Sequence, residues 1–161
     1  MAKNHEETTN AMRLLRAAKI PFETRSYEVD ESDLSGVHAA KLLGVPPEQV
    51  FKTLVAKGEK RGPLVFVIPV AEELDLKKCA AATGDKRVEL IPMKDLLPLT
   101  GYIRGGCSPV GMKKLFPTYF DETATLHEQI LVSAGKRGLQ LILDPQQLCS
   151  FLGGNYSDLT V

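Results

Sequence analysis

The sequence predicts an α+β fold whose mixed sheet curls into a small barrel. Apolar runs of strand length alternate irregularly with segments of helix length, which differs from a regular βα repeat. Two of these runs, Gln129–Ser133 and Leu139–Leu143, flank a five-residue loop and predict a hairpin. The chain has 161 residues, of which 43% are hydrophobic and 25% charged. We therefore expect one domain with a sizeable core, spanning residues 1–161.

Caps, breakers and periodicity define the elements of the first third. Thr8 or Thr9 is placed to cap a helix that ends before Pro21. Alternation over Phe22–Val29 predicts a strand. A glycine and a proline close the short helix expected over Val37–Leu43.

Two apolar runs, Val50–Ala56 and Leu64–Ile68, predict strands that are buried on both faces. Alanine and lysine content favours a helix over Leu74–Ala82. A short strand over Val88–Ile91 and a short helix over Met93–Leu97, ending before a proline, follow.

The last third contains a further apolar stretch at Thr118–Phe120, then the predicted hairpin. Asp144 and Pro145 have the residue types of an N-cap and a first helical position, so a helix should run to Leu152. The capping role alone could account for Asp144. A final short strand is expected within residues 155–161.

Composition excludes several classes of protein. Twenty basic and twenty acidic side chains give zero formal net charge, which argues against tight nucleic-acid binding through the protein's own field. The three cysteines are widely spaced, so neither a disulfide framework nor a zinc site is predicted. Residues 1–7 lack the apolar stretch of a signal peptide, and no apolar run is long enough to span a membrane. We expect a cytoplasmic protein with no metal and no membrane contact.

The glycine-rich stretch Gly105–Gly111 is the first candidate site. Its glycines permit positive φ, and such a loop can direct several backbone N–H groups at one oxyanion, carboxylate or phosphate. A sharp connection with no ligand is the alternative. The residues after the loop are not the Lys-Ser/Thr pair of a P-loop, so nucleotide binding is disfavoured.

Lys52 is the second candidate. Strand alternation places it on the same face as Val50 and Leu54, where an unpaired ammonium is costly. The side chain must either reach solvent at the end of the sheet or point its charge into a cleft.

Three stretches, 50–55, 105–114 and 133–139, together resemble the YbaK/EbsC family of aminoacyl-tRNA deacylases, and most of all its branch that acts on cysteinyl-tRNA(Pro). The same fold is an inserted editing domain in bacterial prolyl-tRNA synthetases. The resemblance implies a mixed-sheet barrel flanked by helices. It also implies removal of cysteine mischarged on proline tRNA, with Cys-tRNA(Cys) as a further question, and no metal or organic cofactor.

The resemblance also assigns residues. Lys52 matches the lysine on which the family's activity depends. The substrate-binding positions it implies are Tyr27, Gly105, Gly106, Cys107, Ser108, Pro109, Gly111, Ser133 and Asp144. Phosphate contacts with the tRNA are expected from Lys113, Lys114, Lys136 and Arg137. Because the chain has little net charge, tRNA specificity should come from a partner, and the resemblance implies that this partner is prolyl-tRNA synthetase.

The family's mechanism is substrate-assisted, through a thiolactone that the cysteinyl thiol forms with its own carbonyl. We expect Lys52 to hold the ribose–phosphate region and amides around Gly106–Ser108 to polarise the carbonyl. Three alternatives remain open at this point. They are a deacylase for alanyl-tRNA(Pro), a non-catalytic module that binds tRNA or the synthetase, and a hydrolase that uses Cys107 as its nucleophile.

Overall fold

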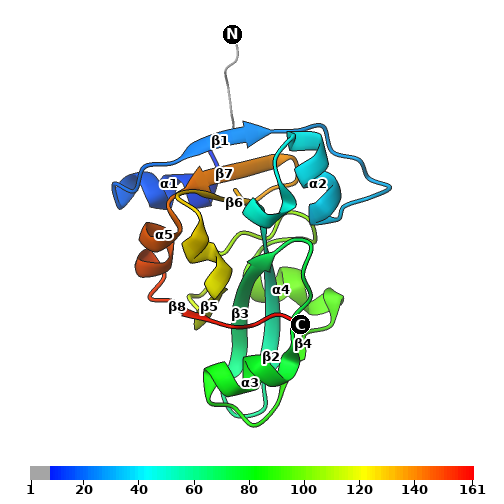
Figure 1. Ribbon diagram of the computed structural model, residues 1–161, viewed down its shortest axis with the longest axis vertical. Helices are drawn as coiled ribbons and strands as arrows, with labels where there is room; N and C mark the ends of the chain where they lie inside the picture. Colours follow the sequence, from blue (N-terminus) through cyan, green and yellow to red (C-terminus); the bar gives the residue numbers. More distant parts are fainter. Residues whose placement is uncertain (1–7) are drawn as a thin grey trace.

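The structure is a computed structural model that describes residues 8–161 (Figure 1). Its α-helices are α1 (Asn10–Ala17), α2 (Gly36–Leu43), α3 (Leu76–Thr83), α4 (Leu96–Thr100) and α5 (Pro145–Phe151). Its strands are β1 (Glu23–Ser26), β2 (Phe51–Gly58), β3 (Gly62–Pro69), β4 (Val88–Leu90), β5 (Thr118–Asp121), β6 (Ile130–Ser133), β7 (Leu139–Leu143) and β8 (Asn155–Ser157). Short 3₁₀ turns are η1 (Pro47–Gln49), η2 (Met93–Asp95) and η3 (Glu122–Leu126).

The strands form two sheets. One has the order β1-β7-β6 and is antiparallel, and the other has the order β4-β2-β3-β5-β8. The larger sheet is mixed, because β5 pairs in parallel with both β3 and β8. In Figure 1 the smaller sheet lies across the top of the molecule and the long β2–β3 hairpin runs down from it.

The predicted α+β class and mixed pairing are confirmed, whereas the barrel does not close. Within residues 8–161 the only β pairing between the two sheets is an isolated parallel bridge between Val50 and Leu131. β2 pairs with β3 and β4 instead, so pairing with β6 does not extend beyond this bridge. The two sheets instead enclose a shared apolar core.

The main core lies between the two sheets and is covered by α1 and α5. Met12 and Leu15 of α1 and Leu148 of α5 are fully buried in it, beside Phe120 and Leu141. A second cluster around Phe66 packs beneath α3. Burial of large apolar side chains from helices and both sheets is the main term that holds these layers together.

The structure corrects several predicted boundaries. Thr9 is the residue that caps α1, accepting from Met12 N at 3.2 Å. β1 is shorter than the predicted strand over Phe22–Val29. The helix expected to stop before Pro98 runs through it, because Pro98 lies in the first turn, where a missing N–H breaks no intrahelical hydrogen bond.

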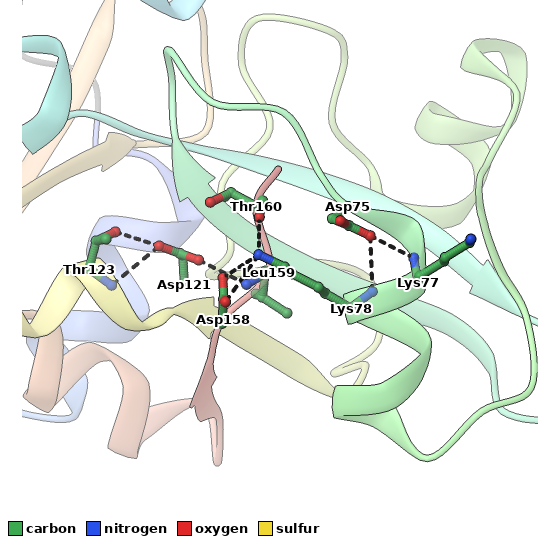
Figure 2. Close-up of polar contacts among 8 residues, drawn as sticks. All are labelled: Asp75, Lys77, Lys78, Asp121, Thr123, Asp158, Leu159 and Thr160. Atoms are coloured by element: carbon green, nitrogen blue, oxygen red, sulfur yellow. Dashed lines mark hydrogen bonds and ion pairs between the residues drawn. The ribbon is translucent and has the colours of Figure 1, made fainter.

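The C-terminal segment is fastened to α3 and β5 by polar contacts (Figure 2). Lys78 Nζ lies 3.0 Å from an Asp158 carboxylate oxygen and donates to Thr160 O at 2.7 Å. Leu159 N donates to the carboxylate of the buried Asp121 at 3.0 Å, and the Leu159 side chain is itself fully buried. These contacts fix the end of the chain against the larger sheet.

Candidate active site

A cavity of about 390 Å³ opens where the start of β2, the start of α2 and the glycine loop meet. Its wall includes five of the residues that the sequence singled out, namely Tyr27, Lys52, Gly105, Cys107 and Ser133. A cavity of this volume is typical of small-molecule sites. The fold therefore brings together side chains that lie more than a hundred residues apart in the chain.

The charge in this cavity is entirely positive. Lys52 and Arg104 line it, and no carboxylate does so within the described part of the chain. Arg104 was not among the predicted site residues, although it directly precedes the glycine loop. Two cations in a partly apolar cavity favour an anionic ligand or a developing negative charge.

The ammonium of Lys52 is neither fully exposed to solvent nor paired with a carboxylate of the described residues. It is half-buried, and no ion pair within 4.0 Å or hydrogen bond to its ammonium occurs among residues 8–161. Burial lowers the pKa of Lys52 below its ordinary value of 10.5, although the carboxylates of Glu73 and Glu72 oppose that shift. The middle of β2 is therefore half-exposed, not buried on both faces as the sequence predicted, because the cavity reaches it.

The glycine loop is pinned in place from both sides. Tyr102 donates its hydroxyl to Val110 O at 2.5 Å, and Ser108 Oγ accepts from Val110 N at 3.2 Å. Gly106 lies so close to the β6–β7 turn that a Cβ there would come within 3.1 Å of the Lys136 and Arg137 backbone. A larger residue at Gly106 would push the loop away from the hairpin.

The backbone amides of this loop are used unevenly. Gly106 N–H donates to Ile103 O at 3.0 Å, so it is not available to polarise a carbonyl as the sequence analysis expected. The N–H groups of Gly105 and Cys107 make no hydrogen bond within the part of the chain that the structure describes, and both residues line the cavity. Unlike Gly106 N–H, these two donors have no protein acceptor that a ligand would have to displace.

Cys107 is a poor nucleophile in this environment. Burial raises the pKa of its thiol to about 12, and the described residues lining the cavity include no histidine. A thiol acts as a nucleophile mainly as its thiolate, and Lys52 and Arg104 in the same cavity do not offset the burial that opposes ionisation of Cys107. The geometry therefore disfavours a cysteine-dependent hydrolase.

Two polar residues in the cavity escaped the sequence analysis. Thr53 Oγ1 and Gln140 Oε1 are buried atoms without a hydrogen-bond partner among the described residues, and both residues line the cavity. Buried polar atoms are normally satisfied, so these two are positioned to bond a ligand. A signal for Gln140 existed, because it interrupts the apolar strand Leu139–Leu143.

Other predicted site residues lie outside the cavity. Asp144 caps α5, accepting from Gln146 N at 2.8 Å. Ser108 is fully buried and bonded within its own loop. Pro109 and Gly111 line a separate cavity of about 190 Å³ behind the loop, together with Lys114.

The predicted tRNA-contacting cations are partly engaged within the protein. Lys113 Nζ donates to Pro98 O at 3.1 Å. Arg137 donates to Arg104 O at 2.8 Å and forms an ion pair with Glu31 at 3.1 Å. Lys114 is exposed and Lys136 half-exposed.

Residues 8–161 contain neither a membrane-spanning helix nor a cluster of metal-ligating side chains. No helix there has the length and apolar character needed to cross a membrane. No group of three or more His, Cys, Asp or Glu side chains in the same range is arranged to hold a metal ion.

Comparisons with known proteins place this cavity in context. The family model of the aminoacyl-tRNA editing domain matches residues 34–151. EbsC of Enterococcus faecalis, which is named as a candidate Cys-tRNA(Pro)/Cys-tRNA(Cys) deacylase, is 48% identical over 98% of this chain and 96% of its own length. A proline–tRNA ligase of Thermosipho melanesiensis is 27% identical over 60% of this chain, which corresponds to 19% of the ligase.

A solved structure shows the same fold. It is described as a candidate trans-editing enzyme for prolyl tRNA synthetase and superposes with a TM-score of 0.79 and 25% identity. The match covers 97% of this chain and 99% of the other.

Proposed function

Since the chain belongs to the family of aminoacyl-tRNA editing domains, we propose that it hydrolyses mischarged Cys-tRNA(Pro) and that it acts on Cys-tRNA(Cys) as well. It would do so as a free-standing enzyme in the cytoplasm, where aminoacyl-tRNA is made. The likeness to EbsC over almost the full length of both chains supports this choice of substrate.

The observation that carries the proposal is the cavity with its unpaired lysine. Lys52 and Arg104 supply positive charge to a cavity large enough for an aminoacyl group and the adjoining ribose. An ester that is attacked at its carbonyl develops negative charge on oxygen, and fixed cations and N–H groups stabilise that charge. The loop donors available for this are Gly105 N–H and Cys107 N–H.

The proposed chemistry uses the substrate's own thiol. Its sulfur forms a bond to the ester carbonyl carbon while the bond from that carbon to the ribose oxygen breaks. The thiol proton passes to the departing ribose oxygen, leaving tRNA and a cysteine thiolactone that water then opens. The protein contributes the folded near-attack geometry and charge stabilisation, with Lys52 as the catalytic residue.

Contacts to the rest of the substrate are a further part of the proposal. Tyr27, Ser133, Thr53 and Gln140 would bind the aminoacyl-adenosine end inside the cavity. Among the predicted phosphate contacts, the exposed Lys114 would contact tRNA more readily than Lys113 and Arg137, which already bond within the protein. We infer that prolyl-tRNA synthetase is a partner, supported by the resemblance to a prolyl-tRNA ligase segment.

The test compares release of labelled amino acid from three substrates, Cys-tRNA(Pro), Ser-tRNA(Pro) and Ala-tRNA(Pro). We expect rapid loss of cysteine alone, and a fall of at least about 100-fold for Lys52→Ala, as found when an oxyanion-stabilising group is removed. Loss of serine at the rate of cysteine would contradict a role for the thiol. Preferred loss of alanine would identify an alanyl-tRNA(Pro) deacylase, and inactivity towards all three would favour a binding module.

A further inference from the structure

A group of basic side chains lies at the far end of the β2–β3 hairpin, away from the smaller sheet. We call it the basic end. It consists of the exposed residues Lys57, Lys60, Arg61, Lys86 and Arg87. The first three belong to β2 and the β2–β3 turn, and the last two to the loop between α3 and β4, at the lower end of the molecule in Figure 1.

One buried carboxylate holds these two turns together. Asp85 accepts hydrogen bonds from the backbone N–H groups of Lys60, Arg61, Lys86 and Arg87, with Arg61 N at 2.9 Å. A further backbone bond joins Glu59 N to Arg87 O at 2.9 Å. The neighbouring Gly58 has no room for a Cβ, which would clash with this carboxylate. The spacing of the basic side chains is thus fixed by backbone contacts.

Several of these cations are available to a ligand. Lys57, Lys60 and Lys86 form no ion pair among the described residues, unlike Lys78, which is bound to Asp158. Arg87 has only a long contact of 3.7 Å to Glu89, and Arg61 bonds Thr83 O and the Tyr119 hydroxyl. Glu59, Glu89 and the ionised Asp85 reduce the net charge of this end. The basic end is therefore suited to contacts with individual phosphates and generates no strong long-range field.

The basic end is continuous with the wall of the cavity. Leu90 of β4 lines the cavity, and β4 continues backwards through Val88 directly into Arg87. Lys57 lies five positions beyond Lys52 along β2, about 17 Å at roughly 3.4 Å per residue, and strand alternation places it on the same face as the cavity-lining Phe51, Thr53 and Val55, opposite to Lys52. A nucleic-acid strand carries a phosphate about every 3.4 Å of helix axis, so this distance corresponds to about five nucleotides.

We propose that the basic end binds the phosphate backbone of the tRNA acceptor arm while the 3′ end occupies the cavity. This inference rests on the proposed function for the position of the 3′ end. It assigns tRNA binding to a surface distinct from Lys114 and Lys136. Each bound phosphate releases condensed counterions, which gives an otherwise neutral protein a salt-dependent hold on its substrate.

The test uses the double variant Lys60→Ala/Lys86→Ala. Asp85 accepts hydrogen bonds from the backbone N–H groups of these residues, so the alanine substitutions keep the contacts that hold the two turns together. The control variant Lys19→Ala/Lys41→Ala removes the same two charges from exposed positions elsewhere. Binding of uncharged tRNA(Pro) is measured against salt concentration. Deacylation is measured on Cys-tRNA(Pro) and on cysteinyl-adenosine, which lacks all tRNA phosphates.

We expect the Lys60/Lys86 variant to lower the magnitude of the log–log salt slope by about 2. Its kcat/KM on Cys-tRNA(Pro) should fall by about tenfold at 0.1 M salt, with cysteinyl-adenosine unaffected, while the control variant stays near wild type. An unchanged salt slope would overturn the proposal, as would an equal loss of activity on both substrates. If wild-type protein deacylates neither substrate but the slope still falls, the surface stands and the proposed reaction fails.

Discussion

Lys52 shows how one side chain acquires chemistry from its surroundings. Its strand places it beside apolar residues, and the cavity leaves its ammonium half-buried without a carboxylate at hydrogen-bond distance. An ammonium in that state is less stable than in water and gains most from a negative charge that enters the cavity. Burial thus destabilises the free ammonium and strengthens its interaction with a negatively charged group of the substrate.

This lowered pKa predicts a pH dependence. A lysine whose pKa lies below 10.5 loses its charge at a lower pH than an ordinary lysine, so deacylation should decline on the alkaline side before pH 10.5. Lys52→Arg should be less active but should lack this decline, because the guanidinium stays charged. Single-turnover rates on Cys-tRNA(Pro), corrected for spontaneous hydrolysis, measure both. Identical alkaline limbs in the two proteins would mean that another group titrates.

Cys107 provides the opposite case, a reactive residue type made inert by burial. With its pKa raised to about 12, the thiol stays protonated near neutral pH. We expect Cys107→Ala to keep kcat within about threefold of wild type, because the proposed nucleophile belongs to the substrate. Lys52→Ala, assayed in parallel, is the control for the fall in kcat that loss of a catalytic group causes. A Cys107 variant that binds substrate normally but does not react would restore the enzyme-thiol mechanism.

Among the elements, the β2–β3 hairpin depends on a contact from outside it. In the hairpin turn, the backbone N–H groups of Lys60 and Arg61 donate to the carboxylate of Asp85, a residue that is only 8% exposed. Burial alone would raise the pKa of Asp85, but the backbone N–H groups of Arg61, Lys60, Lys86 and Arg87 together lower it below 3.8. The ionised form is therefore the one that stabilises the fold.

Substitution of Asp85 should consequently destabilise the protein in a pH-dependent manner. Asp85→Asn is expected to lower the melting temperature by several degrees at pH 7, because the amide replaces a charged acceptor. A depressed carboxyl pKa contributes stability above 3.8 that disappears as the pH falls below that value. Urea unfolding of both proteins from pH 7 to pH 3 should show a constant difference that shrinks below about pH 4. A difference that does not change across this range would show that the charge is irrelevant.

For the molecule as a whole, zero net charge is compatible with tRNA binding if positive and negative side chains are distributed unevenly over the surface. The cavity wall holds two cations and no anion among the described residues, and unpaired lysines gather at the basic end. Elsewhere, ion pairs such as Lys78–Asp158 and Arg137–Glu31 neutralise their partners locally. Such a protein should bind tRNA weakly by itself, which gives a synthetase partner a role in delivering it.

The sequence by itself predicted most of the local structure and the residues of the candidate site. Caps, glycines and periodicity located most helices and strands, including the β6–β7 hairpin, because these signals act over a few neighbouring residues. The resemblance in three short stretches led to the editing-domain family, which the family model confirms. Five of the predicted site residues line one cavity in the structure, namely Tyr27, Lys52, Gly105, Cys107 and Ser133.

Only the tertiary structure decided how these pieces meet. Whether the sheet closes depends on long-range pairing, and in the described chain the bridge between Val50 and Leu131 is the only β pairing between the two sheets. Thr53 looks like an ordinary strand residue in the sequence, and Gln140 only interrupts an apolar strand; the cavity beside them is what gives their unpartnered polar atoms a role. Asp144 carried a plausible site assignment in the sequence, yet lies at a helix cap outside the cavity. Proximity across the fold arises from the packing of distant segments, and no local pattern encodes it.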